Sequence, residues 1–166
     1  MYNLATNIPC EHFIILANTA TYGGGGIYNS YTLTTAHHPS FRPVVVHEFG
    51  HSFGGLGDEY FYETADNNDE MHSLSHEPWE PNITTLVDFE SKWADMVAEG
   101  VEIPTKVTEE RSKNYVVGVY EGGNSVFRYS SSARDFISPS AVGSFITISE
   151  QLCKNSIAAR SHASLR

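Results

Sequence analysis

Two histidines and a glutamate stand at a spacing that can bind and use a metal ion. Residues 47–51 read HEFGH, the pattern H-E-x-x-H. In a helix, positions i and i+4 lie on the same face, so His47 and His51 can reach one ion, and imidazole is a good ligand for Zn²⁺. Glu48 can act on a water at the metal without binding the metal itself. The pattern predicts a zinc site with two histidine ligands and Glu48 as general base.

A bare match to this pattern can arise by chance, but its setting favours a helix that would hold the two histidines. Residues 41–53 are predicted to be helical, because Ser40 can cap the segment and Pro43 fits its first turn. Gly54 and Gly55 are natural stop residues, since either can adopt the left-handed conformation that follows a helix. Four apolar side chains can share one side of this helix: Val44, Val45, Phe49 and Phe53.

A catalytic zinc site needs a third protein ligand and an open position. The next side chains able to bind a metal after the glycine-rich turn are Asp58 and Glu59. The metzincin pattern H-E-x-x-H-x-x-G-x-x-H/D would place the last ligand at Gly57, and the second glycine of the turn can absorb one extra residue. We favour Asp58, with Glu59 as the next alternative. The competing interpretation is that both residues only begin an acidic loop.

Two predicted strands precede this helix. Residues 12–18 are apolar and end in turn-forming residues, which is typical of a buried strand. The four glycines at 23–26 predict either a flexible turn or a close approach of the backbone. Residues 27–36 read as a second strand, and 27–34 are predicted to be an edge strand that binds an extended peptide. The substrate-binding residues predicted on it are Ile27, Tyr28, Asn29, Ser30, Tyr31 and Thr32.

The remaining chain has weaker signals. Residues 56–82 read as a long acidic loop, 88–99 as a helix capped by Asp88, 115–120 as a strand and 145–159 as a C-terminal helix. We find no internal repeat and no linker. The predicted fold is α/β (α+β), a single domain over 1–166 with a mixed twisted sheet and an active-site helix.

Composition excludes several classes of protein. The 166 residues are 40% hydrophobic and 18% charged, which is typical of a globular domain. A net charge of −10 argues against a nucleic-acid partner, and no apolar run reaches the ~18–20 residues of a membrane span. Cys10 and Cys153 form no CxxC pair; a disulfide between them is possible, but two free thiols are favoured. The first residues do not resemble a secretory signal.

Longer segments resemble one known family. The run HEFGHSFGGLGDEY at 47–60 follows YGGGGIYNSYTLTTAHHPSFRPVVV at 22–46, and PWEPNITTLVDFESKW at 78–93 and VGVYEGG at 117–123 come later. Together they resemble the bacterial immunoglobulin A metalloendopeptidase family, a metzincin-like group of zinc peptidases (hydrolases). The resemblance covers about residues 7–123.

The resemblance implies a zinc-dependent endopeptidase with one catalytic Zn²⁺. It implies that His47, His51 and Asp58 bind the ion and that Glu48 is the general acid/base. The substrates implied are proteins or peptides, with immunoglobulin or another host protein as candidates, and relatives of this kind act in secreted form or at the cell surface. The cleavage specificity does not follow from the sequence.

Two departures from the family pattern qualify these expectations. The chain starts at a predicted core strand, whereas family members begin earlier, so we expect a partial catalytic domain. A methionine-containing turn is also expected beneath the zinc, but the segment YSSSAR at 129–134 has no methionine there, and Ser132 or Ala133 would have to replace it. From these two points we expect weak activity for this chain alone. The alternative is a degraded peptidase that binds zinc or peptide without efficient catalysis.

Overall fold

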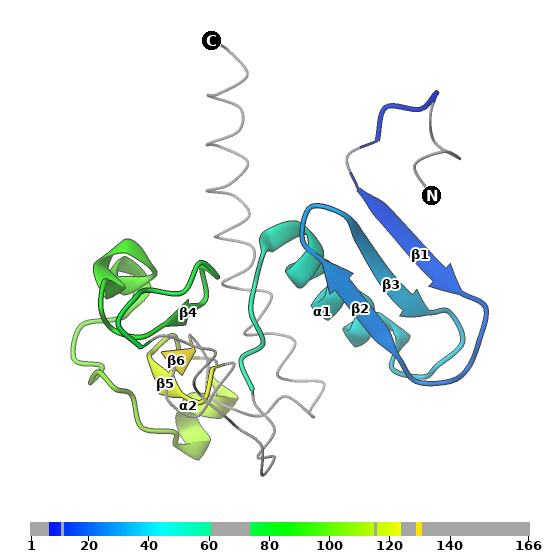
Figure 1. Ribbon diagram of the computed structural model, residues 1–166. Helices are drawn as coiled ribbons and strands as arrows, with labels where there is room; N and C mark the ends of the chain where they lie inside the picture. The colour runs from blue at the N-terminus through cyan, green and yellow to red at the C-terminus, as the bar shows by residue number, and fades with distance from the viewer. Residues whose placement is uncertain (1–6, 11, 61–73, 115, 124–128, 131–166) are drawn as a thin grey trace. The chain divides into compact units, whose positions relative to one another are not determined.

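The computed structural model describes residues 7–10, 12–60, 74–114, 116–123 and 129–130 (Figure 1). The chain forms two compact units, Met1–Gly55 and Leu56–Arg166, which are described separately below. Helices and small sheets occur together, so the fold is α+β, as predicted from the sequence. Among the described residues, no helix has the length and apolar character needed to cross a membrane.

The first unit contains a mixed three-stranded sheet. Its strands are β1 (Phe13–Ala17), β2 (Gly24–Ile27) and β3 (Tyr31–Thr35). Their order is β1-β3-β2, with β3 parallel to β1 and antiparallel to β2. The predicted strand at 12–18 is confirmed as β1, and the predicted mixed sheet is confirmed as well.

The predicted edge strand at 27–34 is wrong. Ile27 ends β2, a turn follows, and β3 is the central strand of the described sheet, paired on both sides. In the turn, Asn29 has a φ of 55°, a left-handed value that asparagine tolerates, and the Ser30 N–H donates to the Ile27 carbonyl at 3.0 Å. The sequence does not predict β2, because a run of glycines has low strand propensity. The strand packs against the following helix, which accounts for its glycines.

That helix is α1 (Phe41–Gly54), and its prediction is confirmed. The carbonyl of Ser40 accepts a hydrogen bond from the Val44 N–H at 3.1 Å, although the Ser40 side chain makes no capping hydrogen bond. Gly55 ends the helix with a φ of 67°, and its N–H donates to the His51 carbonyl at 3.1 Å. The predicted glycine stop is therefore the αL type that needs no Cβ.

A small polar network attaches α1 to the sheet. The His12 Nε2 lies 3.0 Å from the Thr32 Oγ1 and 3.1 Å from the Ser52 Oγ, and the two hydroxyl oxygens lie 2.6 Å apart. The His12 ring also packs edge-on against Phe49 and Phe53. Thr32 is fully buried in this network, and its contact with substrate stays a prediction that the structure does not test. The network helps to fix the rotation of α1 about its own axis.

The second unit contains a small antiparallel sheet. Its strands are β4 (Ile83–Thr84), β5 (Tyr120–Glu121) and β6 (Tyr129–Ser130), in the order β4-β6-β5. The described parts of the predicted acidic loop, 56–60 and 74–82, contain no helix or strand. The unit has a short helix, α2 (Glu109–Lys113), which the sequence did not predict.

The predicted helix at 88–99 is wrong. Two single turns of 3₁₀ helix replace it, η3 (Phe89–Ser91) and η4 (Ala94–Met96). Lys92 interrupts them with a φ of −102° and a ψ of −118°, while its ammonium group donates to the carbonyl oxygens of Pro78 and Glu80 at 2.5 and 2.8 Å. The buried indole of Trp93 donates to a carbonyl outside this segment. These tertiary hydrogen bonds override the local helical pattern.

In the described part of the predicted strand at 115–120, which is 116–120, only Tyr120 belongs to β5 (Tyr120–Glu121). The Gly118 carbonyl accepts the indole N–H of Trp93 at 2.8 Å. The Val119 N–H donates to the Thr105 Oγ1 at 2.9 Å, and the Val119 carbonyl accepts the Thr105 N–H at 2.7 Å. The backbone groups of Gly118 and Val119 therefore form hydrogen bonds with Trp93 and Thr105, and not with a neighbouring β-strand.

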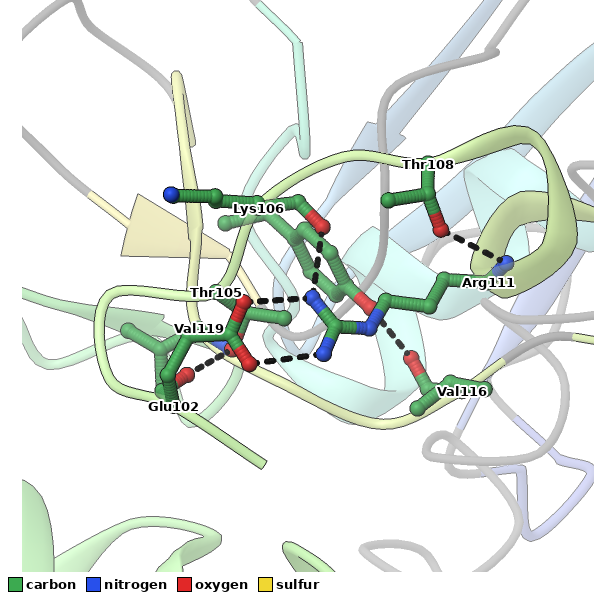
Figure 2. Close-up of polar contacts among 8 residues, drawn as sticks. Glu102, Thr105, Lys106, Thr108, Arg111, Val116 and Val119 are labelled. Carbon is green, nitrogen blue, oxygen red and sulfur yellow. Dashed lines mark hydrogen bonds and ion pairs between the residues drawn. The ribbon is translucent and has the colours of Figure 1, made fainter. Parts of the chain in front are cut away.

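An ion pair closes the loop before α2. Figure 2 shows the Arg111 guanidinium donating to both carboxylate oxygens of Glu102, at 2.7 and 2.6 Å. Arg111 also donates to the Lys106 carbonyl at 3.0 Å. The hydrogen bonds from Arg111 lower the pKa of the exposed Glu102 carboxyl to about 2. Of the methionine-free segment 129–134, Tyr129 and Ser130 form β6 and 131–134 lie outside the described residues, as do the predicted C-terminal helix at 145–159 and Cys153.

Candidate metal centre

The structure brings His47 and His51 together on one face of α1. Their Nε2 atoms lie 3.0 Å apart, and the two rings meet nearly at right angles, at 84°, with centroids 4.4 Å apart. A regular helix places positions i and i+4 in this relation, so the arrangement follows from the local sequence once the helix forms. Both side chains are half-buried.

Glu48 belongs to the same cluster. One possible ligand atom from each of His47, Glu48 and His51 lies within 4.8 Å of the others. A tetrahedral Zn²⁺ with bonds of ~2.0–2.1 Å would hold two histidine nitrogens about 3.3 Å apart. The observed separation of 3.0 Å is close to that value, so the two imidazoles fit a shared ion with a small adjustment. The donor set can hold a metal ion.

Asp58, the predicted third ligand, lies in the second unit, as does its alternative, Glu59. The structure therefore joins His47, Glu48 and His51 but does not test the third ligand, which stays a prediction. Asp58 is half-buried, whereas Glu59 is only 3% exposed. The two neighbouring carboxylates thus occupy different environments.

A buried amide holds the loop around Asp58, and the sequence analysis missed it. The Asn82 Oδ1 accepts the Gly57 N–H at 2.8 Å, and its Nδ2 donates to the Gly57 carbonyl at 2.9 Å and to the Glu59 Oε1 at 3.1 Å. We call these contacts the Asn82 clamp. They fix the residues on both sides of Asp58. No local pattern indicates the clamp, because 25 positions separate Asn82 from Gly57.

Replacing Asn82 with alanine is expected to destabilise the fold. The change would leave the Gly57 N–H, the Gly57 carbonyl and the Glu59 carboxylate buried without this partner, and each such loss is worth about 1–3 kcal/mol. We expect unfolding in urea to show a total loss of at least about 2 kcal/mol. Asn114→Ala is a matched control, since Asn114 is exposed, and should leave the midpoint nearly unchanged. Equal midpoints for the two variants would contradict a stabilising role for the clamp.

The fold and the His47-Glu48-His51 cluster define the chain as an α+β protein with a possible metal site on one helix. Comparison with known families shows the family to which it belongs. A family model described as IgA Peptidase M64 matches residues 1–121, so the chain belongs to this peptidase family. No curated protein matches the sequence. The resemblance found in the sequence is confirmed, and a peptidase acts on protein or peptide substrates.

Proposed function

We propose that the chain is a zinc-dependent endopeptidase that hydrolyses peptide bonds in protein substrates. The observation that carries this proposal is the convergence of the His47 and His51 Nε2 atoms, 3.0 Å apart, beside Glu48 in a member of a peptidase family. Imidazole ligands favour Zn²⁺ among the common ions of such sites. Asp58 is the proposed third ligand, which leaves a position for substrate and water.

The residues of the chain have separate roles in this proposal. When bound, Zn²⁺ would polarise the scissile carbonyl and lower the pKa of water. His47 and His51 would hold the ion through their Nε2 atoms, which lie 3.0 Å apart. Glu48 takes a proton from the attacking water and then delivers it to the leaving amine nitrogen, which is the general base and general acid role of a single carboxylate.

The substrate would add to the edge of the sheet in the first unit. An extended peptide can pair with an open strand through main-chain hydrogen bonds. Within the described part of the chain, β3 is paired on both sides, so β1 and β2 form the two edges, and of these β2 packs against the part of α1 that carries Glu48. Ile27 and Tyr28 at its end are 52% and 44% exposed. We therefore move the proposed edge from 27–34 to β2 and the turn that follows it.

Immunoglobulin A is the first protein substrate to try, because it is named in the description of the family. Such a substrate is met outside the cell, which is the location we propose for the enzyme. The test combines zinc analysis of the purified chain with cleavage of immunoglobulin A and of a peptide library. We expect about one zinc per chain, and cleavage that a chelator abolishes and added zinc restores. Cleavage that survives complete metal removal, or a chain that neither binds zinc nor cleaves, would overturn the proposal.

A further inference from the structure

The glycine-rich strand β2 lies directly against the part of α1 that carries Glu48 (Figure 1). We propose that Gly24 is a positioning residue for Glu48: the missing side chain at this position leaves the space that the carboxylate occupies. This inference rests on the proposed function, in which Glu48 is the general base. It adds a residue on a neighbouring strand that controls where that base points.

The geometry at Gly24 supports this directly. A Cβ atom built at Gly24 would lie 2.5 Å from the Glu48 Oε1, 2.9 Å from the Glu48 Cγ and 2.7 Å from the Val44 Cγ1. Carbon and carboxylate oxygen do not approach this closely without a bond, so one of them must move. The Glu48 carboxylate is the end of a flexible side chain. A side chain at position 24 would therefore turn the carboxylate away, and the Val44 Cγ1 would have to shift as well.

Gly26 meets the same helix in a different way. A Cβ atom there would overlap the backbone carbonyl oxygen of Glu48 and lie 2.8 Å from the His51 Cβ. Backbone atoms cannot rotate out of the way, so a side chain at Gly26 would force β2 and α1 apart. Gly26 sets the distance between strand and helix, whereas Gly24 sets the space for the carboxylate.

The other two glycines of the run provide the contrast. A Cβ atom at Gly23 or at Gly25 would meet nothing within 4 Å. Alternate residues of a strand point to opposite faces, so Gly24 and Gly26 face α1 while Gly25 faces away. None of the four has a positive φ, so their backbones do not demand glycine. The need for glycine at 24 and 26 therefore comes from the helix they face.

These contacts predict different effects of alanine at neighbouring positions. In Gly24→Ala we expect kcat to fall about 100-fold, because a displacement of about 1 Å in a catalytic group has effects of this size. Zinc content should stay near that of the unchanged chain, since neither metal-binding histidine is touched, and KM should stay near its value because the added Cβ points toward α1 and leaves the main-chain edge of β2 open. Gly23→Ala is the matched control, one residue earlier and in open space, and should keep full activity.

A readout without catalysis tests the contact itself. In the metal-free protein, Gly24→Ala is expected to lower Tm by a few degrees, about 2–4 °C. In the Glu48→Ala background two of the three close atoms are absent and the Val44 Cγ1 remains, so the same change should lower Tm by a smaller amount. Such non-additivity is the mark of residues in contact. Gly23→Ala should show no difference between the two backgrounds.

The outcomes separate this inference from the proposed function. Additive Tm changes for Gly24→Ala and Glu48→Ala, or equal kcat values for Gly24→Ala and Gly23→Ala in an active enzyme, would overturn the inference and leave the function standing. An unchanged chain without zinc-dependent cleavage would overturn the function, and the Tm cycle would still decide whether Gly24 makes room for Glu48.

Discussion

Replacing Glu48 with glutamine is expected to remove peptide cleavage while zinc stays bound. Glutamine has nearly the same shape as glutamate, but its amide cannot accept the proton of the attacking water. General acid–base catalysis raises the rate about 10²–10⁴-fold, so we expect kcat to fall by at least about 10²-fold. The measurement is kcat on a cleaved peptide together with the zinc content of the same preparation.

A matched control for this variant is Glu90→Gln, which removes one negative charge from an exposed position in the second unit. It should cleave as the unchanged chain does. If Glu48→Gln lost its zinc, Glu48 would be a ligand rather than a base. If it cleaved at an undiminished rate, another group would have to accept the proton.

The helix and its metal-binding face could be predicted because their determinants are local. Pro43, the glycine stop at Gly55 and the H-E-x-x-H spacing all lie within or next to α1. Helical geometry then brings His47 and His51 together without any contribution from distant residues. The same reasoning explains why β1, a short apolar run bounded by turn residues, was predicted nearly to the residue.

The elements that were mispredicted depend on distant contacts. Strand β2 consists largely of glycine, and it forms where it does because α1 leaves room for a backbone without side chains. The segment 88–99 has an apolar stripe at helical spacing, but Lys92 and Trp93 each bond to carbonyl groups far away in the sequence. Propensity is a weak guide where such contacts exist.

The candidate site also has one part that depends on local sequence and one part that depends on distant contacts. His47, Glu48 and His51 follow from one short segment, whereas the Asn82 clamp joins residues from two loops. The clamp bears on the choice between Asp58 and Glu59, which the sequence left open. It gives the Glu59 carboxylate a structural partner, and Asp58 stays the predicted metal ligand.

Replacing Asp58 with alanine is expected to weaken zinc binding strongly. Loss of an outer partner of a metal ligand changes affinity by about 10–100-fold, and loss of a ligand should exceed that range. The measurement is zinc affinity by competition with a chelator. Glu59→Gln is the comparison, because glutamine keeps an oxygen that can accept the Asn82 hydrogen bond. We expect its zinc affinity to stay within about tenfold of the unchanged chain.

If Glu59→Gln weakened zinc binding and Asp58→Ala did not, Glu59 would be the ligand. Glu59 is 3% exposed, and its Oε1 accepts the Asn82 Nδ2 at 3.1 Å. Glu59 could bind an ion through its other oxygen, Oε2, and keep that hydrogen bond, or it could release the bond, which is worth about 1–3 kcal/mol. Asp58, the predicted ligand, makes none of the three hydrogen bonds of the clamp. Because Asp58→Ala and Glu59→Gln both keep the partners of the clamp, a loss of zinc affinity in Asp58→Ala alone would assign the ligand role to the Asp58 carboxylate.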